Sequence, residues 1–248
     1  AAEKIAGASG DDIFTIVDKL SANIRRSLIT STQVANEPGK NVADVTTHSL
    51  EAYKEYLQGL DYEDMLYRPE AIEHYKRAIA IDSAFAMAYY RLSALQNEPS
   101  PRRSYLQKAL QYSARVTRRE RDLIKISELR IINNVPEEVQ QRLEEFVANY
   151  PDDKEGFYLL GSYSRGRENY QAAVDAMTKA IELDPFFKKA YNTLAYSFDE
   201  LGNSEKSIWA INKYISLAPG EANPYDTRGD LYAKHGKLSE AADSYRHA

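Results

Sequence analysis

Hydrophobic residues recur every three or four positions along most of the chain, and polar residues fill the positions between them. This spacing places the hydrophobic side chains on one face of an α-helix, so it predicts a chain built from amphipathic helices. Two apolar stripes carry the pattern, namely Leu159, Leu160 and Tyr163, and then Ala173, Val174, Met177, Ala180 and Ile181. Gly-Asn-Ser at 202–204 and His-Gly-Lys at 235–237 predict turns between helices.

The helical pattern repeats with a fixed period. Pro151, Pro185 and Pro219 follow predicted helix ends and lie 34 residues apart. Extending this frame in both directions gives six units, which start at Ala52, Ala86, Glu120, Lys154, Lys188 and Ala222. The eighth residue of every unit is small: Gly59, Ser93, Ser127, Gly161, Ala195 and Gly229. A small residue at a fixed position indicates that the two helices of a hairpin approach each other closely there.

This pattern resembles the tetratricopeptide repeat, whose 34-residue unit has small residues at positions 8 and 20, an aromatic residue at 24 and proline at 32. The resemblance covers residues 52–248 and is strongest from Gly156 to Pro219. It implies an all-α fold, a right-handed α-solenoid of about six helix hairpins, which we assign to residues 48–248. Because position 20 holds the bulky Tyr105 and Val139 in units two and three, we expect those hairpins to be splayed or shifted.

Residues 1–47 are predicted to form an amphipathic helix followed by a linker. Asp11 or Asp12 caps a helix that runs to about Leu28, and the polar stretch after it contains Pro38-Gly39. The segments 10–18 and 45–53 resemble the junction into tetratricopeptide arrays of large bacterial signalling proteins, including serine/threonine kinases, adenylate-cyclase-like proteins and regulators with a TolB-like domain. The resemblance implies that an effector domain precedes this region. Alternatively, the helix caps the exposed face of the first repeat.

The composition and the motifs exclude several classes of chemistry. The chain has no cysteine, so it has neither disulfides nor thiolate metal sites. No run of about 20 apolar residues is present, so we expect no membrane span. The four histidines lack metal-site spacing, and no phosphate-binding loop or nucleophile elbow occurs. We therefore predict a non-enzymatic protein without metal or cofactor, and we take the cytoplasm as the default location.

One segment has an unusual charge. Residues 101–130 contain nine Lys or Arg and three acidic residues, which gives this segment a charge of +6. Because the net charge of the whole chain is −5, the remainder of the chain carries −11. Such a patch can bind an acidic peptide, a phosphorylated segment or nucleic acid. The alternative is a solvated face paired with the acidic units on either side. Nucleic acid is disfavoured because the remainder of the chain repels phosphate.

In the tetratricopeptide family the first helix of each unit lines a binding groove, mainly through positions 2, 5, 6, 9 and 12. The resemblance therefore implies a peptide-binding groove with these candidate residues: Tyr53, Tyr56, Tyr90, Arg91, Arg121, Lys125, Tyr158, Arg165, Asn192 and Tyr196. Tyrosine and arginine often carry the binding energy of interfaces. An extended or helical peptide is the ligand that such a groove fits.

These observations predict a scaffold that binds a protein or peptide, as part of a larger bacterial signalling or regulatory protein. The alternative is a structural self-assembly element without a groove ligand, in which exposed repeat ends form a homodimer. The two hypotheses differ in one feature. The first predicts exposed aromatic residues in an open groove, and the second predicts that the same residues are buried in a symmetric interface.

Overall fold

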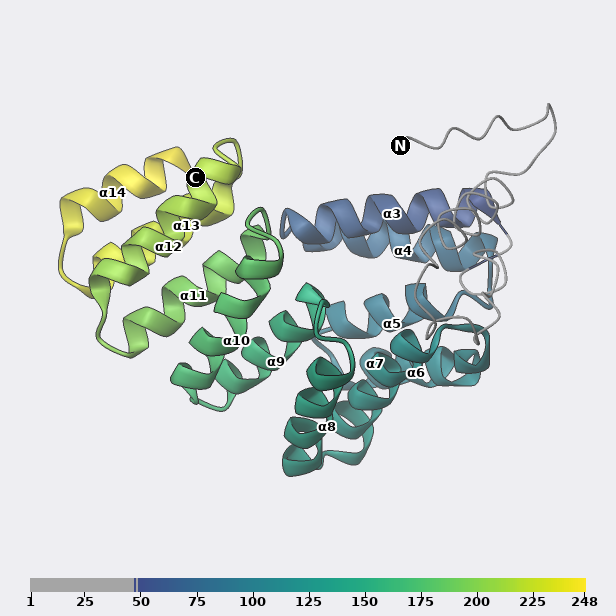
Figure 1. Ribbon diagram of the computed structural model, residues 1–248. Coiled ribbons are helices and arrows are strands. Elements are labelled where there is room, and N and C mark those ends of the chain that lie inside the picture. The colour runs from purple at the N-terminus through teal and green to yellow at the C-terminus, as the bar shows by residue number, and fades with distance from the viewer. Residues whose placement is uncertain (1–46, 48) are drawn as a thin grey trace, which may run out of the picture. The chain divides into compact units, whose positions relative to one another are not determined.

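The computed structural model describes residue 47 and residues 49–248 (Figure 1). Of the segment 1–47 predicted to form a helix and a linker, only residue 47 is among the described residues. Within the described part, the chain forms twelve α-helices, one 3-10 turn and one π-helical turn, and no strand. The predicted all-α helical-repeat fold is confirmed.

The described residues divide into two compact units. Unit 1 is the described part of Ala1–Glu63 together with Tyr67–Ile132, and unit 2 is Asp64–Leu66 together with Asn133–Ala248. The helices up to the main boundary between the units, near residue 133, are α3 (Leu50–Asp64), α4 (Arg68–Ile81), α5 (Ala86–Leu95), α6 (Pro99–Gln111), η1 (Ser113–Arg115), α7 (Arg118–Glu128) and η2 (Leu129–Asn133). The helices after it are α8 (Pro136–Asn149), α9 (Lys154–Gly166), α10 (Tyr170–Leu183), α11 (Lys188–Glu200), α12 (Ser204–Leu217), α13 (Ala222–Lys234) and α14 (Leu238–His247).

The helices follow the 34-residue frame closely. The first helices of four units, α5, α9, α11 and α13, begin at the predicted residues, and α3 and α7 each begin two residues earlier. In unit 2, α9 packs on α10, α11 on α12 and α13 on α14, so consecutive helices form hairpins (Figure 1). Each hairpin also packs on the next through α10 with α11 and through α12 with α13. In a solenoid, each hairpin buries its apolar side chains only against the hairpins next to it, and this packing is the same.

The second hairpin is shifted along the sequence, as its bulky position 20 suggested. Its second helix, α6, begins at Pro99, whereas the other second helices begin at residues spaced by multiples of 34 from Arg68. Proline is favoured in the first turn of a helix, and both Pro99 and Pro101 lie there. The shift brings the Arg102 carbonyl, instead of Tyr105, against the small residue Ser93, whose hydroxyl donates to it at 2.8 Å.

The small residues at position 8 make the closest helix contacts. A Cβ atom on Gly161 would lie 2.9 Å from Cε of Met177 and 3.1 Å from the carbonyl oxygen of Ala173. The equivalent atom on Gly59 would lie 2.5 Å from the ring of Tyr75. The residue at position 8 therefore packs chiefly on the residue at position 24, which is Tyr75 in the first hairpin and Met177 in the fourth. In the fourth hairpin, the backbone of position 20 is a second close neighbour of Gly161.

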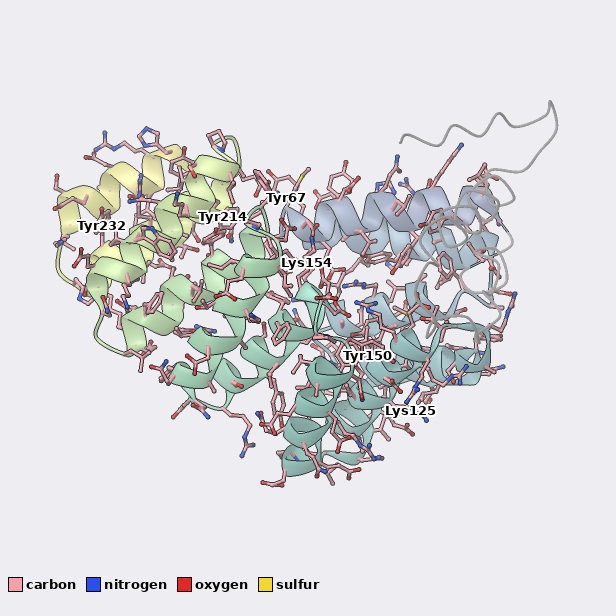
Figure 2. All side chains as sticks on the ribbon, viewed as in Figure 1. Tyr67, Lys125, Tyr150, Lys154, Tyr214 and Tyr232 are labelled. Atoms are coloured by element: carbon pink, nitrogen blue, oxygen red, sulfur yellow. The ribbon has the colours of Figure 1, made fainter. Side chains whose placement is uncertain are left out.

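Each unit has its own core of fully buried side chains. Unit 1 buries Tyr75, Phe85, Leu92, Leu106 and Ile124. Unit 2 buries Met177, Leu194, Ile211, Tyr214 and Leu231, which come from successive helices of the array (Figure 2 labels Tyr214). The buried tyrosines keep a polar partner, because the hydroxyl of Tyr75 donates to Glu63 at 2.7 Å and that of Tyr214 donates to Glu221 at 2.9 Å.

Candidate partner-binding face

The first helices of the last three repeats form one continuous face of unit 2. Helix α11 contacts α9 on one side and α13 on the other (Figure 1). Four of the ten predicted groove residues belong to these helices, namely Tyr158 and Arg165 on α9 and Asn192 and Tyr196 on α11. All four are partly exposed. The 34-residue frame therefore brings together residues that are far apart in the sequence.

A row of polar side chains crosses this face from α9 to α13, and we call it the polar row. The guanidinium of Arg165 lies over the ring of Tyr196, 5.0 Å from its centre. The hydroxyl of Tyr196 lies 3.5 Å from Oγ1 of Thr227 and 3.4 Å from Oδ2 of Asp230. Thr227 in turn donates to Oδ1 of Asn192 at 3.0 Å. Side chains from three repeats thus hold one another in a fixed arrangement.

The environment of Tyr196 opposes its ionisation. Burial raises the pKa of this phenol, and the nearby carboxylates of Asp230 and Asp226 raise it further, against an opposing hydrogen bond with Thr227. The ring therefore stays neutral near pH 7. A neutral tyrosine beneath an arginine offers a partner both a flat apolar surface and hydrogen-bonding groups, a combination common at protein interfaces.

Two shielded polar atoms beside the polar row have no hydrogen-bond partner among the described residues. They are the Nε donor of Arg165 on α9 and the Oδ1 acceptor of Asn223 on α13. Shielded polar groups are normally paired, because leaving one unpaired costs about 1–3 kcal/mol.

Tyr158 lies at the beginning of the same face. Its ring meets the edge of Phe187 at 5.5 Å between centres, and the ammonium of Lys189 lies 5.4 Å from the Tyr158 ring centre. Lys189 also lies 3.7 Å from the carboxylate of Glu155. Packing by Phe187 and Lys189 fixes the orientation of the Tyr158 ring.

Three further residues complete this face. Thr227 and Asp230 occupy positions 6 and 9 of the last repeat, so the frame places them on the same face as Asn192 and Tyr196. Tyr245 on α14 donates to Oδ1 of Asp230 at 2.8 Å and fixes that carboxylate. No sequence pattern indicates the Tyr245 contact, because it joins the two helices of one hairpin through side-chain orientation.

The aromatic candidates of unit 1 lie mostly in the interior. Tyr56 is 8% exposed and Tyr90 is 6% exposed. The ring of Tyr56 packs on Phe85 at 4.9 Å and on Tyr75 at 5.6 Å, and burial raises the pKa of its phenol. Tyr53 is partly exposed and stacks on Tyr56 at 6.4 Å. Tyr56 and Tyr90 consequently act first as packing residues of unit 1.

The basic candidates of unit 1 differ in whether their side chains already bind a neighbouring group. Arg91 pairs with Glu63 at 3.1 Å. Arg121 donates through Nε to the Ser113 carbonyl at 3.0 Å and through a terminal nitrogen to the Val116 carbonyl at 3.3 Å, so it anchors its own loop. Lys125 is exposed (Figure 2). These residues do not form a connected row comparable with that of unit 2.

Two features are absent from the described residues. They contain no group of three or more His, Cys, Asp or Glu side chains arranged to hold a metal ion. No helix among them is both long enough and apolar enough to cross a membrane.

The stacked hairpins and the face formed by their first helices define a class, the α-helical repeat proteins. Within that class, residues 155–187 and 188–221 each match the family model described as tetratricopeptide repeat. Residues 155–221 thus contain two tetratricopeptide repeats in succession.

Curated relatives match only part of this chain. The human PEX5-related protein is 31% identical over 77 residues, which cover 31% of this chain and 12% of the relative. The small glutamine-rich tetratricopeptide repeat-containing protein 2 of Mycosarcoma maydis is 26% identical over 86 residues, which cover 35% of this chain and 24% of the relative. The matches thus span less than a quarter of each relative.

A solved structure supports the fold over a longer stretch. A chain of the APC/C hetero-tetramer Cut9–Hcn1 superimposes with a TM-score of 0.52 at 18% sequence identity, and the match covers 79% of this chain and 39% of that chain. At this identity the likeness concerns the fold alone.

Proposed function

We propose that this chain is a protein-interaction module whose face of α9, α11 and α13 binds an extended segment of a partner protein. The observation that carries the proposal is the polar row, in which Arg165, Tyr196 and Asn192 are partly exposed and already held in place. Preorganised side chains lose little conformational freedom on binding, so more of the contact energy becomes affinity.

The family supports the same function at a coarser level. One relative is named for its tetratricopeptide repeats, and the matching solved chain belongs to a hetero-tetramer with a second protein. A bacterial signalling setting rests only on the resemblance of segments 10–18 and 45–53, and a cytoplasmic location remains a prediction. The proposal therefore concerns the binding face and leaves the larger protein open.

The test is a selection of peptides from a display library on the full chain, followed by fluorescence anisotropy of the selected peptide. Arg165→Ala and Asn192→Ala should each weaken its binding at least about tenfold, as hot-spot truncations do. Lys179→Ala is the matched control, because Lys179 is exposed on the second helix α10. Equal affinity of all three variants, or a selection without a specific peptide, would remove the proposed face from consideration.

One observation favours the self-assembly alternative as a second candidate. The side chain of Leu238, the first residue of α14, is 71% exposed, and Tyr245 on the same helix is also exposed. Exposed apolar groups that gather on one element mark interaction sites. A homodimer through α14 predicts a concentration-dependent mass in light scattering that Leu238→Lys lowers to the monomer mass. A monomer at all concentrations would contradict this candidate.

A further inference from the structure

A pocket of about 450 Å³ opens between the hairpin of α11 and α12 and the hairpin of α13 and α14 in unit 2. Its walls are mainly apolar and include Ile208 on α12 and Leu231 and Tyr232 on α13 (Figure 2 labels Tyr232). Leu231 belongs to the buried core of unit 2, and Ile208 packs against that core. The volume lies within the range of about 300–1,000 Å³ that is common for ligand-binding pockets.

A group of paired polar side chains holds one wall of this pocket in place. The buried carboxylate of Asp199 on α11 lies 2.5 Å from Nε2 of His235 and 2.7 Å from the ammonium of Lys234. Nε2 of His235 also lies 3.4 Å from the hydroxyl of Ser204, which is the first residue of α12. These contacts join α11, α12 and the turn after α13, so the pocket is already formed in the chain without a ligand.

The small side chain of Ser204 leaves the pocket open. At the same position of the 34-residue frame, four other second helices begin with a larger residue, namely Arg68, Pro136, Tyr170 and Leu238. Tyr170 is the equivalent residue of the preceding hairpin and is partly buried. Equivalent positions of a solenoid face equivalent spaces, so a tyrosine ring at position 204 would enter the pocket. The fifth repeat therefore leaves vacant a space that suits an aromatic ring.

The rim of the pocket carries one acid and one base. Glu205 and Lys237 both line the pocket and are exposed. In the part of the chain that the structure describes, neither of them forms an ion pair. Lys237 lies 5.7 Å from the centre of the Tyr232 ring, at the apolar wall. A ligand with a basic and an acidic group beside an apolar one therefore complements the charges of this rim.

We propose that this pocket binds an aromatic side chain of a partner protein, with a basic residue on one side of it and an acidic residue on the other. Aromatic side chains bury a large apolar area, and they often anchor protein interfaces. The flanking charges pair with Glu205 and Lys237. The pocket shares no residue with the polar row, so its test and the test of the function proposed above can fail independently.

The test is a titration of the full chain with acetyl-Lys-Phe-Glu-amide and with acetyl-Glu-Phe-Lys-amide at low ionic strength. The methyl NMR signals of Ile208 and Leu231 report on the pocket. Two comparison peptides carry alanine or leucine in place of phenylalanine. The decisive variant is Ser204→Tyr, which fills the pocket with the residue type of Tyr170. The matched control is Ser204→Ala, which also removes the hydroxyl but leaves the pocket open.

We expect saturable shifts of both methyl signals with a phenylalanine peptide, and at least about tenfold weaker binding of the alanine peptide. Ser204→Tyr should abolish the shifts, and Ser204→Ala should retain them. An unchanged melting temperature of Ser204→Tyr, measured by circular dichroism, separates a filled pocket from an unfolded repeat.

Two variants at the rim test the proposal without altering the interior. Glu205→Gln and Lys237→Gln should each weaken binding of the tighter phenylalanine peptide about two- to fivefold, as expected for exposed ion pairs. Lys206→Gln, at an exposed position of α12, is the control for the loss of one charge and should leave binding unchanged.

Four outcomes overturn the proposal. The absence of saturable shifts means that the pocket takes no aromatic side chain. Equal binding of the alanine and phenylalanine peptides means that the ring is not recognised. Tighter binding of the leucine peptide means that the pocket takes an aliphatic group. Undiminished binding by a folded Ser204→Tyr chain means that the peptide binds elsewhere.

Discussion

At the scale of single residues, the repeat depends on a few close contacts. Gly161 leaves no room for a side chain, because its added Cβ would meet both Met177 and the backbone of Ala173. We predict that Gly161→Leu lowers the free energy of unfolding by at least about 1–3 kcal/mol, the usual cost of overpacking. Gly166→Ala is the control, since nothing lies within 4 Å of its added Cβ. Urea denaturation measures both, and equal stabilities would disprove the assigned frame.

A second residue-scale prediction concerns Asp199 on α11. Its side chain is 2% exposed and receives hydrogen bonds from Lys234 at 2.7 Å and His235 at 2.5 Å. Burial alone would raise the pKa of this carboxyl, but the bonds from Lys234 and His235 outweigh burial and hold the pKa below its usual value. We predict that Asp199→Asn costs about 1–3 kcal/mol at pH 7, as expected for a hydrogen bond to a charged group.

The pH dependence of that cost follows from linkage. A carboxyl with a lower pKa in the folded state stabilises the fold above its unfolded pKa of about 3.9. This contribution is lost as the pH falls through the folded pKa. The stability difference between Asp199→Asn and the parent chain should therefore shrink as the pH is lowered from 5 towards 2. A constant difference would contradict the role of the charge, and Glu200→Gln, at an exposed neighbour, should have little effect throughout.

At the scale of elements, α7 has the most complete helix start in the described chain. The hydroxyl of Thr117 accepts from the backbone N–H of Glu120 at 3.2 Å, and the Glu120 carboxylate accepts from the Thr117 N–H at 3.0 Å. This reciprocal pair is a capping box. We predict that Thr117→Ala lowers stability by about 1 kcal/mol, whereas Thr117→Ser retains the cap. Thermal melts monitored by circular dichroism distinguish the two, and equal melting temperatures would show that the cap is dispensable.

At the scale of the whole molecule, stability is shared between neighbouring hairpins. In a solenoid each repeat contacts only the repeats beside it, so a local defect should remain local. We predict that Gly59→Leu, which forces a side chain into the Tyr75 ring, speeds amide exchange in α3 to α5. Exchange in α11 to α14 should stay unchanged. Hydrogen exchange with mass spectrometry reads both regions, and a uniform increase would show that the whole chain unfolds as one unit.

The class of fold and the positions of most helices follow from the amino-acid pattern alone. The pattern consists of a 34-residue period, small residues at position 8 and prolines after helix ends. It predicts a solenoid of helix hairpins, because a solenoid repeats the same local packing in every unit. The starts of α5, α9, α11 and α13 agree with that frame to the residue. The same frame placed Tyr158, Arg165, Asn192 and Tyr196 on one face.

The role of each side chain at a predicted position becomes visible only in the folded chain. The frame treats Tyr56 and Tyr196 alike, yet Tyr56 is buried against Phe85 whereas Tyr196 lies beneath Arg165. The frame also does not show that Arg121 binds its own loop. The reason is physical. Periodicity fixes the direction in which a residue leaves its helix, but burial and hydrogen bonding depend on the particular neighbours that the folded chain brings to it.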